Sequence, residues 1–537
     1  MKSNTNAGRA RRTISIFAAL MMVLTGFGGL LGNAGAQDRP ILRFGTNAAD
    51  IASLDPHYAS ATQDRVIVDL IFNGLVRFKP GDSSTFEPDI ATAVPEPVDA
   101  ADGSQTWSFT LRDDVMCQAS PSTDAYALTS ADVLFSFEKA ANADTSTYAS
   151  NYAGYTFAAP DPQTFTVTLA AAISPTLFLP SMANYAGGYV ICQQPYEALG
   201  ADGFLANPVG TGPFAFESYA PQSNVSLVAN DEFYRGAPKL GGVDVRFVAD
   251  STARELAIQS GDLDVIAGFP EAAWVDRLNE GGEVQVDVFG VGEAVFLNLN
   301  VEHEILKDPK VREAILLAIN REDTVNLSGS PVSEPIYSIV PADFVPGGLT
   351  EEEATAAGVN YAQDIERAKA LLVEAGYPEG FELDLVTSEQ DSYRNAYTVL
   401  QEQLRGIGIT VNLEPVQHAT MHEQIRLDSN AITIYIAFRP TADVYLTQFF
   451  STSGGTTNFS KFTLDELVAE ARATTDPDAQ AELWKQANTE ILQNFAGYGL
   501  MYTNQVYART AAVDYGHELV SVVQLYPGID ETTTITN

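Results

Sequence analysis

Basic residues are scarce in this chain: of 537 residues, 30 are Lys or Arg and 69 are Asp or Glu, which gives a formal net charge of -39. A protein that binds the nucleic-acid backbone needs clustered Lys and Arg to displace counterions. The acidic excess therefore excludes nucleic acid as a partner. The chain is not disordered either, because 45% of its residues are hydrophobic. Its length predicts about three domain equivalents.

Cysteine is nearly absent, with Cys117 and Cys192 as the complete set. Two thiols are too few for a disulfide framework or a thiolate zinc site. In an oxidising compartment the pair is a candidate disulfide, and two separate buried thiols are the alternative. The spacing does not decide between them.

Long hydrophobic runs are missing beyond residue 31, and residues 14–31 form the one such run. Small residues at 34–36 follow it, which is typical of a cleaved signal peptide over residues 1–36. The basic residues before the run are Lys2, Arg9, Arg11 and Arg12. Export by the Sec or the twin-arginine route stays open, and an uncleaved membrane anchor is the alternative. We expect a soluble mature protein in the periplasm.

The hydrophobic pattern of the first half of the chain predicts a compact α+β unit. A strand at residues 41–45 and a helix at 64–74 precede two alternating strands at 107–111 and 164–169. Between these strands, residues 129–132 read TSAD and predict a capping box that opens a helix.

From residue 243 onward, strands and helices alternate, which predicts an α/β lobe. Asp308 can cap a helix that has Pro309 in its first position. The predicted strands are 243–248, 263–266, 381–385, 407–413 and 432–438. The predicted helices are 252–260, 308–319, 364–375, 464–473 and 479–495. Repeats and low-complexity linkers are lacking, so we expect closely packed lobes that share strands.

Several short motifs together carry a family resemblance. Residues 207–214 read NPVGTGPF, 230–238 read NDEFYRGAP and 260–264 read SGDLD, while VREA and AINR lie within 308–323 and AGYP begins at 375. In this order they resemble the solute-binding proteins of the peptide/nickel/opine ABC importer family, the bacterial extracellular solute-binding proteins of family 5.

The glycines of the first motif permit positive φ or a close backbone approach at Gly210 and Gly212, and Pro213 favours an extended exit. Neither Lys-Ser nor Lys-Thr follows Gly212, which argues against a phosphate cradle. We expect this segment to be a structural crossing between lobes.

The resemblance implies an α/β, two-lobed periplasmic binding protein fold with an additional α+β domain. Its first lobe would combine residues 37–70, 207–290 and 506–537, the added domain would be 71–206, and the second lobe 291–505. Ligand would lie between the lobes, and their closure would create the surface recognised by the ABC permease subunits of the inner membrane. The resemblance further implies a monomer that is not an enzyme and has no cofactor.

In relatives, the strand and loop that match residues 434–445 line the cleft. Tyr435 stands where a Trp is common, and Phe438 follows it. The usual acidic partner of a peptide α-ammonium is missing, and Arg439 lies near its place, which suits a carboxylate better. Asp443 is the alternative ammonium partner. Against these roles, Tyr435 fits a core residue and Arg439 a solvated or salt-bridged surface group.

The loop after the first strand, residues 58–64, corresponds to a cleft-facing loop in relatives. Tyr58 and Thr62 are therefore predicted ligand contacts. The alternative is a loop that is simply solvated.

His418 and His422 have the i,i+4 spacing that places two imidazoles on one helix face. Glu423 follows the second His, so the zinc-protease motif is absent, and a surface helix is the alternative. If the pair faced the cleft, a metal or metal-chelate cargo would become credible.

The sequence thus predicts a periplasmic substrate-binding component of an ABC importer that captures a peptide or related small polar solute. Carriers of a metal chelate, an opine or an oligosaccharide are alternatives within the same fold. An exported hydrolase is the rival from another class, but the chain has no Gly-x-Ser-x-Gly elbow.

Overall fold

The computed structural model describes residues 39–290 and 292–536. The predicted signal peptide, residues 1–36, lies outside the described residues. No helix in the described part is both long and apolar enough to cross a bilayer.

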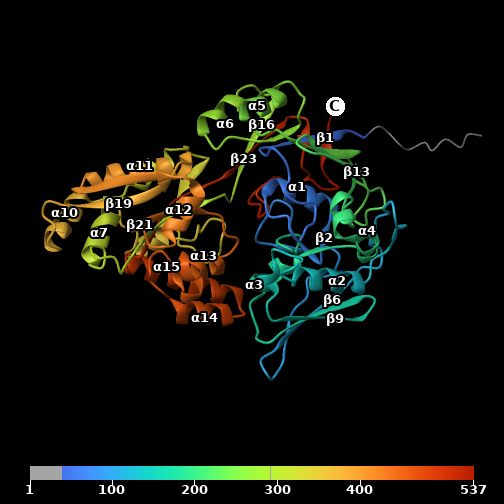
Figure 1. The fold of residues 1–537 in the computed structure, drawn as a ribbon, viewed down its shortest axis with the longest axis horizontal. Coiled ribbons are helices and arrows are strands. Elements are labelled where there is room, and N and C mark those ends of the chain that lie inside the picture. The colour runs from blue at the N-terminus through green and yellow to red at the C-terminus, as the bar shows by residue number, and fades with distance from the viewer. Residues whose placement is uncertain (1–38, 291, 537) are drawn as a thin grey trace, which may run out of the picture. The chain divides into compact units, whose positions relative to one another are not determined.

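A seven-stranded sheet is built from three distant parts of the chain. Its strand order is β12-β13-β14-β1-β15-β23-β16, and β1 is parallel to both of its neighbours. The strands are β1 (Ile41–Thr46), β12 (Phe214–Ala220), β13 (Asn224–Ala229), β14 (Gly242–Phe247), β15 (Val265–Ala267), β16 (Val284–Phe289) and β23 (Gln505–Thr510). Helix α1 is Thr62–Ile71, and α5 (Ser251–Gln259) and α6 (Ala272–Asn279) lie beside β16 and β23 (Figure 1).

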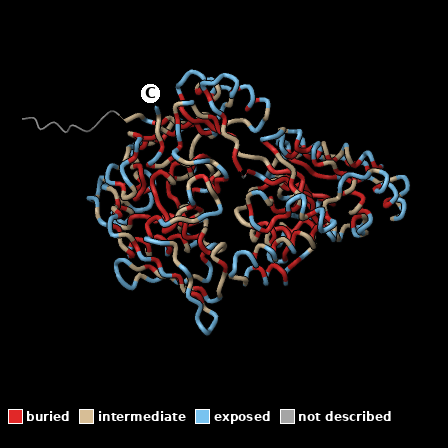
Figure 2. The backbone as a smooth tube through the Cα atoms, turned by 180° about the vertical axis from the view of Figure 1, so that it is seen from behind, coloured by how far each residue is buried: buried red, intermediate tan, exposed pale blue. Residues whose placement is uncertain are grey.

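The segment between α1 and β12 forms a separate antiparallel sheet with the order β5-β6-β10-β9. Its strands are β5 (Val98–Asp99), β6 (Gln105–Thr110), β9 (Tyr155–Asp161) and β10 (Thr164–Leu169). Helix α2 (Ser130–Ala140) packs on this sheet, and the predicted capping box of Thr129 and Asp132 is confirmed at its start. The tip of the β5–β6 hairpin is exposed (Figure 2).

Short strands and helices make up the rest of the segment between α1 and β12. The paired strands are β2 (Asn73–Gly74) with β11 (Tyr189–Val190), β3 (Val76–Phe78) with β4 (Phe86–Pro88), and β7 (Met116–Cys117) with β8 (Tyr126–Ala127). The helices are α3 (Pro175–Phe178) and α4 (Gln193–Ala206), with 3₁₀ turns at Ala149–Tyr152 and Leu179–Met182. A disulfide joins Cys117 in β7 to Cys192 at the start of α4, with 5.8 Å between their Cα atoms.

Residues 294–503 form a second sheet, of order β18-β22-β17-β21, and a parallel pair β19-β20. The four-stranded sheet is antiparallel throughout. Its strands are β17 (Ala294–Leu299), β18 (Ser333–Pro335), β21 (Ile432–Ala437) and β22 (Gly497–Thr503), and the pair is β19 (Phe381–Ser388) and β20 (Ile409–Val416).

Nine helices surround these strands in the described residues. They are α7 (Pro309–Ala318), α8 (Arg321–Val325), α9 (Glu351–Ala356), α10 (Ile365–Glu374), α11 (Asp391–Arg405), α12 (His418–Ile425), α13 (Ala442–Phe450), α14 (Asp465–Ala473) and α15 (Pro477–Gln493), with a 3₁₀ turn at Thr452–Thr457. Asp308 caps α7 and Pro309 is its first residue, as the sequence predicts. The last strand pair, β24 (Val513–Asp514) with β25 (Thr534–Ile535), follows β23.

The apolar side chains of the described residues form separate cores. One cluster runs from Ala294 to Tyr502, another lies around the seven-stranded sheet, and a third gathers Trp107, Phe109 and their neighbours between α1 and α4. In Figure 2 the buried residues lie in the interior of the molecule and the exposed residues lie mainly along its outer loops. From Arg39 onward the chain is nevertheless one compact unit. The exact lobe boundaries stay a prediction.

Two sequence predictions need correction. The helix predicted at residues 64–74 ends at Ile71, because Phe72 is extended and Asn73–Gly74 pair with β11. The 207–214 segment is not a passage between the two large sheets, because it joins α4 to β12 and packs on the end of α1. The passages between the large sheets are instead β16 to β17 and β22 to β23.

Candidate functional site

A polar cavity of about 320 Å³ lies at the carboxyl end of β21, next to the starts of α11 and α12. The strand itself is apolar and buried, so it is a rigid support, and its last residues bring polar side chains to the cavity. The lining residues are Glu293, Gln390, Ser392, Tyr393, His418, His422, Tyr435, Ile436, Ala437, Phe438 and Arg439.

The loop after β21 is fixed by its own contacts. Thr441 caps α13 by accepting a hydrogen bond from the Val444 N–H. The Tyr445 hydroxyl donates to the Ala437 carbonyl at 3.1 Å and accepts from the Arg439 N–H at 3.2 Å. Because one side chain holds both ends of this turn, the loop presents Phe438 and Arg439 in a defined position.

Arg439 has no carboxylate partner among the described residues. Its Nε donates to Gln448 Oε1 at 2.6 Å and its Nη1 to the Phe438 carbonyl at 2.7 Å, while the guanidinium lies 5.7 Å from the Phe449 ring centroid. Nη2 has no protein partner in these residues. The arrangement leaves an oriented cation at the cavity, and of the two alternatives the salt-bridged surface group does not fit these contacts.

Tyr435 lines the cavity and also belongs to the core. It is 8% exposed, and its ring centroid lies 4.9 Å from that of Phe449 and 5.5 Å from that of Phe459. Phe438 is half-buried and packs against the apolar cluster of the segment between α1 and α4. It therefore connects the loop after β21 with that segment.

The structure does not bring the other predicted ligand contacts to this cavity. Asp443, in the first turn of α13, pairs with Arg472 at 3.3 Å and accepts a hydrogen bond from Thr447. Burial raises the pKa of the Asp443 carboxyl. The Tyr58 hydroxyl donates to the Asp144 carbonyl at 2.9 Å, and Thr62 begins α1. None of the three lines the cavity.

His418 and His422 both line the cavity, so they do not lie on the outer face of a surface helix. His418 is the first residue of α12, which gives the pair helical spacing. Their Nε2 atoms are 3.2 Å apart, and Nδ1 of His418 lies 3.1 Å from Ser388 Oγ. Within the described residues no group of three or more His, Cys, Asp or Glu is arranged to hold a metal ion.

Sequence reasoning missed Glu293 and Tyr393, which line the cavity but lie far from residues 434–445 in the sequence. Desolvation raises the pKa of the Glu293 carboxyl, and the positive charge of Arg439 acts in the other direction. Burial raises the pKa of the Tyr393 hydroxyl. Glu293 immediately precedes β17 and Tyr393 lies in the first turn of the amphipathic helix α11, and neither pattern marks a site in the sequence.

A second, more apolar cavity of about 180 Å³ lies on the other side of the same loop. Pro440 and Thr441 line it together with Phe78, Leu177 and Trp484, so its walls come from both halves of the chain. The Thr176 hydroxyl in α3 donates to Gln480 Oε1 in α15 at 2.6 Å beside it. The loop after β21 thus separates a polar cavity from an apolar one.

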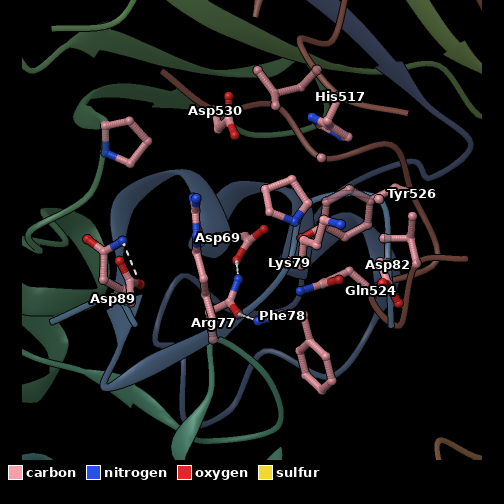
Figure 3. Close-up of a pocket in the computed structure, with 18 of the residues that line it drawn as sticks. Asp69, Arg77, Phe78, Lys79, Asp82, Asp89, His517, Gln524, Tyr526 and Asp530 are labelled. Carbon is pink, nitrogen blue, oxygen red and sulfur yellow. Dashed lines mark hydrogen bonds between the residues drawn. The ribbon is translucent and has the colours of Figure 1, made fainter. Parts of the chain in front are cut away.

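A third pocket, of about 60 Å³, lies between α1, the turn after β3 and the C-terminal segment (Figure 3). Asp69 accepts hydrogen bonds from Asn184 Nδ2 at 2.7 Å and the Tyr189 hydroxyl at 3.2 Å. Desolvation raises the pKa of this carboxyl to about 6. The pocket has room for a few water molecules and is too small for a solute.

Two mixed α/β lobes with a polar cavity and an apolar cavity at one loop define the class of periplasmic binding proteins. The chain belongs to the bacterial extracellular solute-binding proteins, family 5, whose middle region matches residues 85–460. It is therefore a substrate-binding component of an ABC importer. The predicted family and fold class are confirmed.

Several curated relatives resemble the chain over most of its length. The probable D,D-dipeptide-binding periplasmic protein DdpA of Escherichia coli K12 is 27% identical, over 85% of this chain and 87% of DdpA. The glutathione-binding protein GsiB of Salmonella paratyphi A is 26% identical, over 82% of this chain and 85% of GsiB.

Two solved structures also resemble the chain over most of its length. MoaA of A. tumefaciens R10, in complex with mannopinic acid, is 34% identical with a TM-score of 0.74, over 93% of this chain and all of MoaA. HbpA2 of Haemophilus parasuis has a TM-score of 0.80 at 22% identity, over 93% of this chain and 100% of HbpA2, and supports the fold alone.

Proposed function

We propose that this protein captures a small polar solute bearing a carboxylate in the periplasm and delivers it to the permease of an ABC importer. The observation that carries this proposal is Arg439, a fixed guanidinium at a polar cavity with Nη2 left for a ligand. A planar guanidinium pairs well with a carboxylate. The relative MoaA was solved with an acid, mannopinic acid, and short peptides also carry a carboxylate.

The two cavities offer the solute two kinds of surface. Arg439, Glu293 and the histidines supply charge and hydrogen-bonding groups on the polar side. Pro440, Trp484 and Phe78 supply apolar surface on the other side. A carboxylate-bearing solute with an apolar or sugar-derived portion fits this division, and a purely apolar solute does not.

The domain boundaries give this proposal its mechanism. With residues 37–70, 207–290 and 506–537 as one lobe and 291–505 as the other, the chain passes between lobes only where β16 leads to β17 and β22 to β23. Two short passages suit a hinge. A solute that contacts both lobes only when they are closed shifts the population toward that state, which the permease then recognises.

The same proposal includes export and handling of the cargo. Residues 1–36 direct the chain to the periplasm, where it acts as a monomer and binds no nucleic acid. It returns its solute unchanged, because it is a carrier and not an enzyme.

The test is a thermal-shift panel of dipeptides, opines, sugars and free carboxylic acids, with recovered solute analysed by mass spectrometry. A ligand at 100 times its Kd should add about 2.7 kcal/mol to the unfolding free energy. Arg439→Gln should remove the shift for carboxylate ligands, while Arg405→Gln, on an exposed turn of α11, should keep it. An unchanged shift in Arg439→Gln, or conversion of the solute, rejects the proposal.

A further inference from the structure

The apolar cavity beside the loop after β21 has a wall of aromatic rings and prolines. Its volume is about 180 Å³, and Phe78, Phe344 and Trp484 contribute rings to it. Prolines stand at four places on the wall, and they are Pro180, Pro346, Pro440 and Pro477. Because proline has a fixed φ and no N–H, these positions are stiff and offer no backbone donor to a ligand.

The polar side chains of this wall are mostly engaged with other protein groups. The Thr176 hydroxyl donates to Gln480 Oε1 at 2.6 Å, which occupies both side chains. Thr441 caps α13 with its hydroxyl oxygen, and the Ser84 hydroxyl donates to Asp82 Oδ1 at 2.6 Å. The wall therefore offers a ligand mainly apolar surface.

A cavity of this kind selects hydrocarbon over hydroxyl groups. A hydroxyl buried here without a partner would lose its hydrogen bonds to water. The indole N–H of Trp484 has no partner among the described residues, but one donor does not satisfy the several hydroxyls of a sugar. An apolar cavity of about 150 Å³ is large enough for benzene, so this one has the size for a six-membered ring.

The apolar cavity begins one residue after the carboxylate-binding group. Arg439 lines the polar cavity, and Pro440 lines the apolar one. Consecutive Cα atoms are about 3.8 Å apart, so a short carbon chain is enough to join a carboxylate at one cavity to a ring in the other. Leu177 and Trp484 line the apolar cavity from different halves of the chain. A ring between them also favours the state in which the halves are together.

We propose that the cargo is a carboxylic acid that carries a compact hydrocarbon ring, with the carboxylate on Arg439 and the ring in the apolar cavity between Leu177 and Trp484. This inference rests on the proposed function and narrows its cargo, because it excludes a sugar-derived second portion. Burial of a phenyl ring should tighten binding by about tenfold to hundredfold relative to the same acid without the ring.

The experiment uses the mature protein and four acids: propionate, 3-phenylpropionate, 3-cyclohexylpropionate and gluconate. The Kd of each acid is obtained from thermal shifts over a concentration series. The two ring-bearing acids should bind at least about tenfold more tightly than propionate. Gluconate, which has hydroxyls in place of the ring, should bind no more tightly than propionate.

Ala481→Leu tests where the ring lies. Ala481 lines the apolar cavity from α15, so a larger side chain there takes up space that the ring needs. This variant should lose the tenfold advantage of the ring-bearing acids. Its Kd for propionate should stay unchanged, which also shows that the variant is folded. Ala479→Leu is the matched control, because Ala479 is exposed on the same helix and does not line this cavity.

The outcomes separate this inference from the proposed function. Equal Kd values for propionate and the ring-bearing acids, or tighter binding of gluconate, would overturn the inference alone if Arg439→Gln still weakens binding of every acid. A ring advantage that survives in Ala481→Leu would place the ring elsewhere and reject it too. Ring-bearing acids that bind Arg439→Gln as tightly as the parent protein, or no binding of any of the four acids, would overturn the proposed function as well.

Discussion

The ammonium group of Lys139 lies 2.8 Å from Asp55 Oδ2 and 3.1 Å from Oδ1, and both side chains are 5% exposed. The pair joins α2 to the loop after β1, across 84 residues of sequence. His57 adds to it, with Nδ1 3.4 Å from Lys139 Nζ and Nε2 3.0 Å from the Tyr189 carbonyl. This buried network fixes the loop that the sequence assigned to ligand binding, which explains why Tyr58 contacts protein groups.

Removing the cation should leave Asp55 as an uncompensated buried charge. Lys139→Met is expected to lower the unfolding free energy by about 3–5 kcal/mol, measured by urea denaturation. Lys310→Met is the matched control, because its pair with Glu374 is 46% and 44% exposed, and it should cost less than about 1 kcal/mol. The double variant Asp55→Asn/Lys139→Met should recover part of the loss. Equal costs for the two single variants would contradict this account.

The stability of the protein should depend on His57 in mildly acidic solution. Burial and the charge of Lys139 lower the pKa of His57 from 6.5 to about 4. The unfolded chain therefore takes up this proton first, and stability is lost as the pH falls from about 6.5 toward 4, by up to about 3 kcal/mol. His57→Gln should remove this dependence in urea titrations at pH 7, 6 and 5.

Asp69 changes the stability of the protein in the opposite direction over the same pH range. Its pKa is raised to about 6, so its contribution is present at low pH and lost as the pH rises through 6. Asp69→Asn should therefore steepen the loss on acidification that His57→Gln removes. If both variants keep the slope of the parent protein, neither group controls it.

The element pattern of the fold was largely predictable from the sequence, because periodicity and caps are local. Asp308 with Pro309 and the Thr129 capping box mark real helix starts. The predicted element boundaries were wrong where long-range strand pairing overrides the local periodicity. Gly74, for example, pairs with Tyr189 although it follows a helical pattern. The antiparallel order of the second sheet could not be predicted from the sequence either. It depends on the pairing of β17 with β21 and β22, which come from distant parts of the chain.

The site was predictable only where a motif pointed to it. The resemblance led to Tyr435, Phe438 and Arg439, which all line the polar cavity. Glu293 lies just before β17 and Tyr393 in the first turn of α11, and no motif marks either position, so only the fold brings them there. Asp443 was misplaced because α13 begins at Ala442 and turns its carboxylate toward Arg472.

Gly210 should tolerate no side chain. The sequence left open whether its role is a positive φ or a close approach, and the structure shows an approach, because an added Cβ would lie 2.1 Å from the Ile71 carbonyl oxygen. Gly210→Ala is expected to lower the unfolding free energy by about 3 kcal/mol. Gly281→Ala is the control, since its nearest neighbour would be 3.5 Å away, and should change stability by less than about 1 kcal/mol. A small effect at both positions would refute the close-approach role.

The hydrogen bond from Thr176 to Gln480 should affect solute affinity more than its strength suggests. Gln480 is held in place because its Nε2 donates to the Ala471 carbonyl at 2.9 Å, so its Oε1 is a fixed acceptor for a hydroxyl from the other half of the chain. Thr176→Val removes the donor at a net cost of about 1 kcal/mol. If this contact exists only in the closed state, that cost appears in solute binding as about a fivefold weaker Kd. The melting temperature of the solute-free protein should change little.

The control for this prediction is Thr168→Val in β10, whose hydroxyl bonds to Thr106 within one sheet. That variant should leave the Kd of the solute found in the thermal-shift panel unchanged. Because both substitutions remove one hydroxyl and keep the side-chain volume, a difference between them isolates the contact between halves of the chain. Equal Kd values for the two variants would show that Thr176 and Gln480 stay bonded when the solute leaves, and the closure would then have to be sought at Phe438 instead.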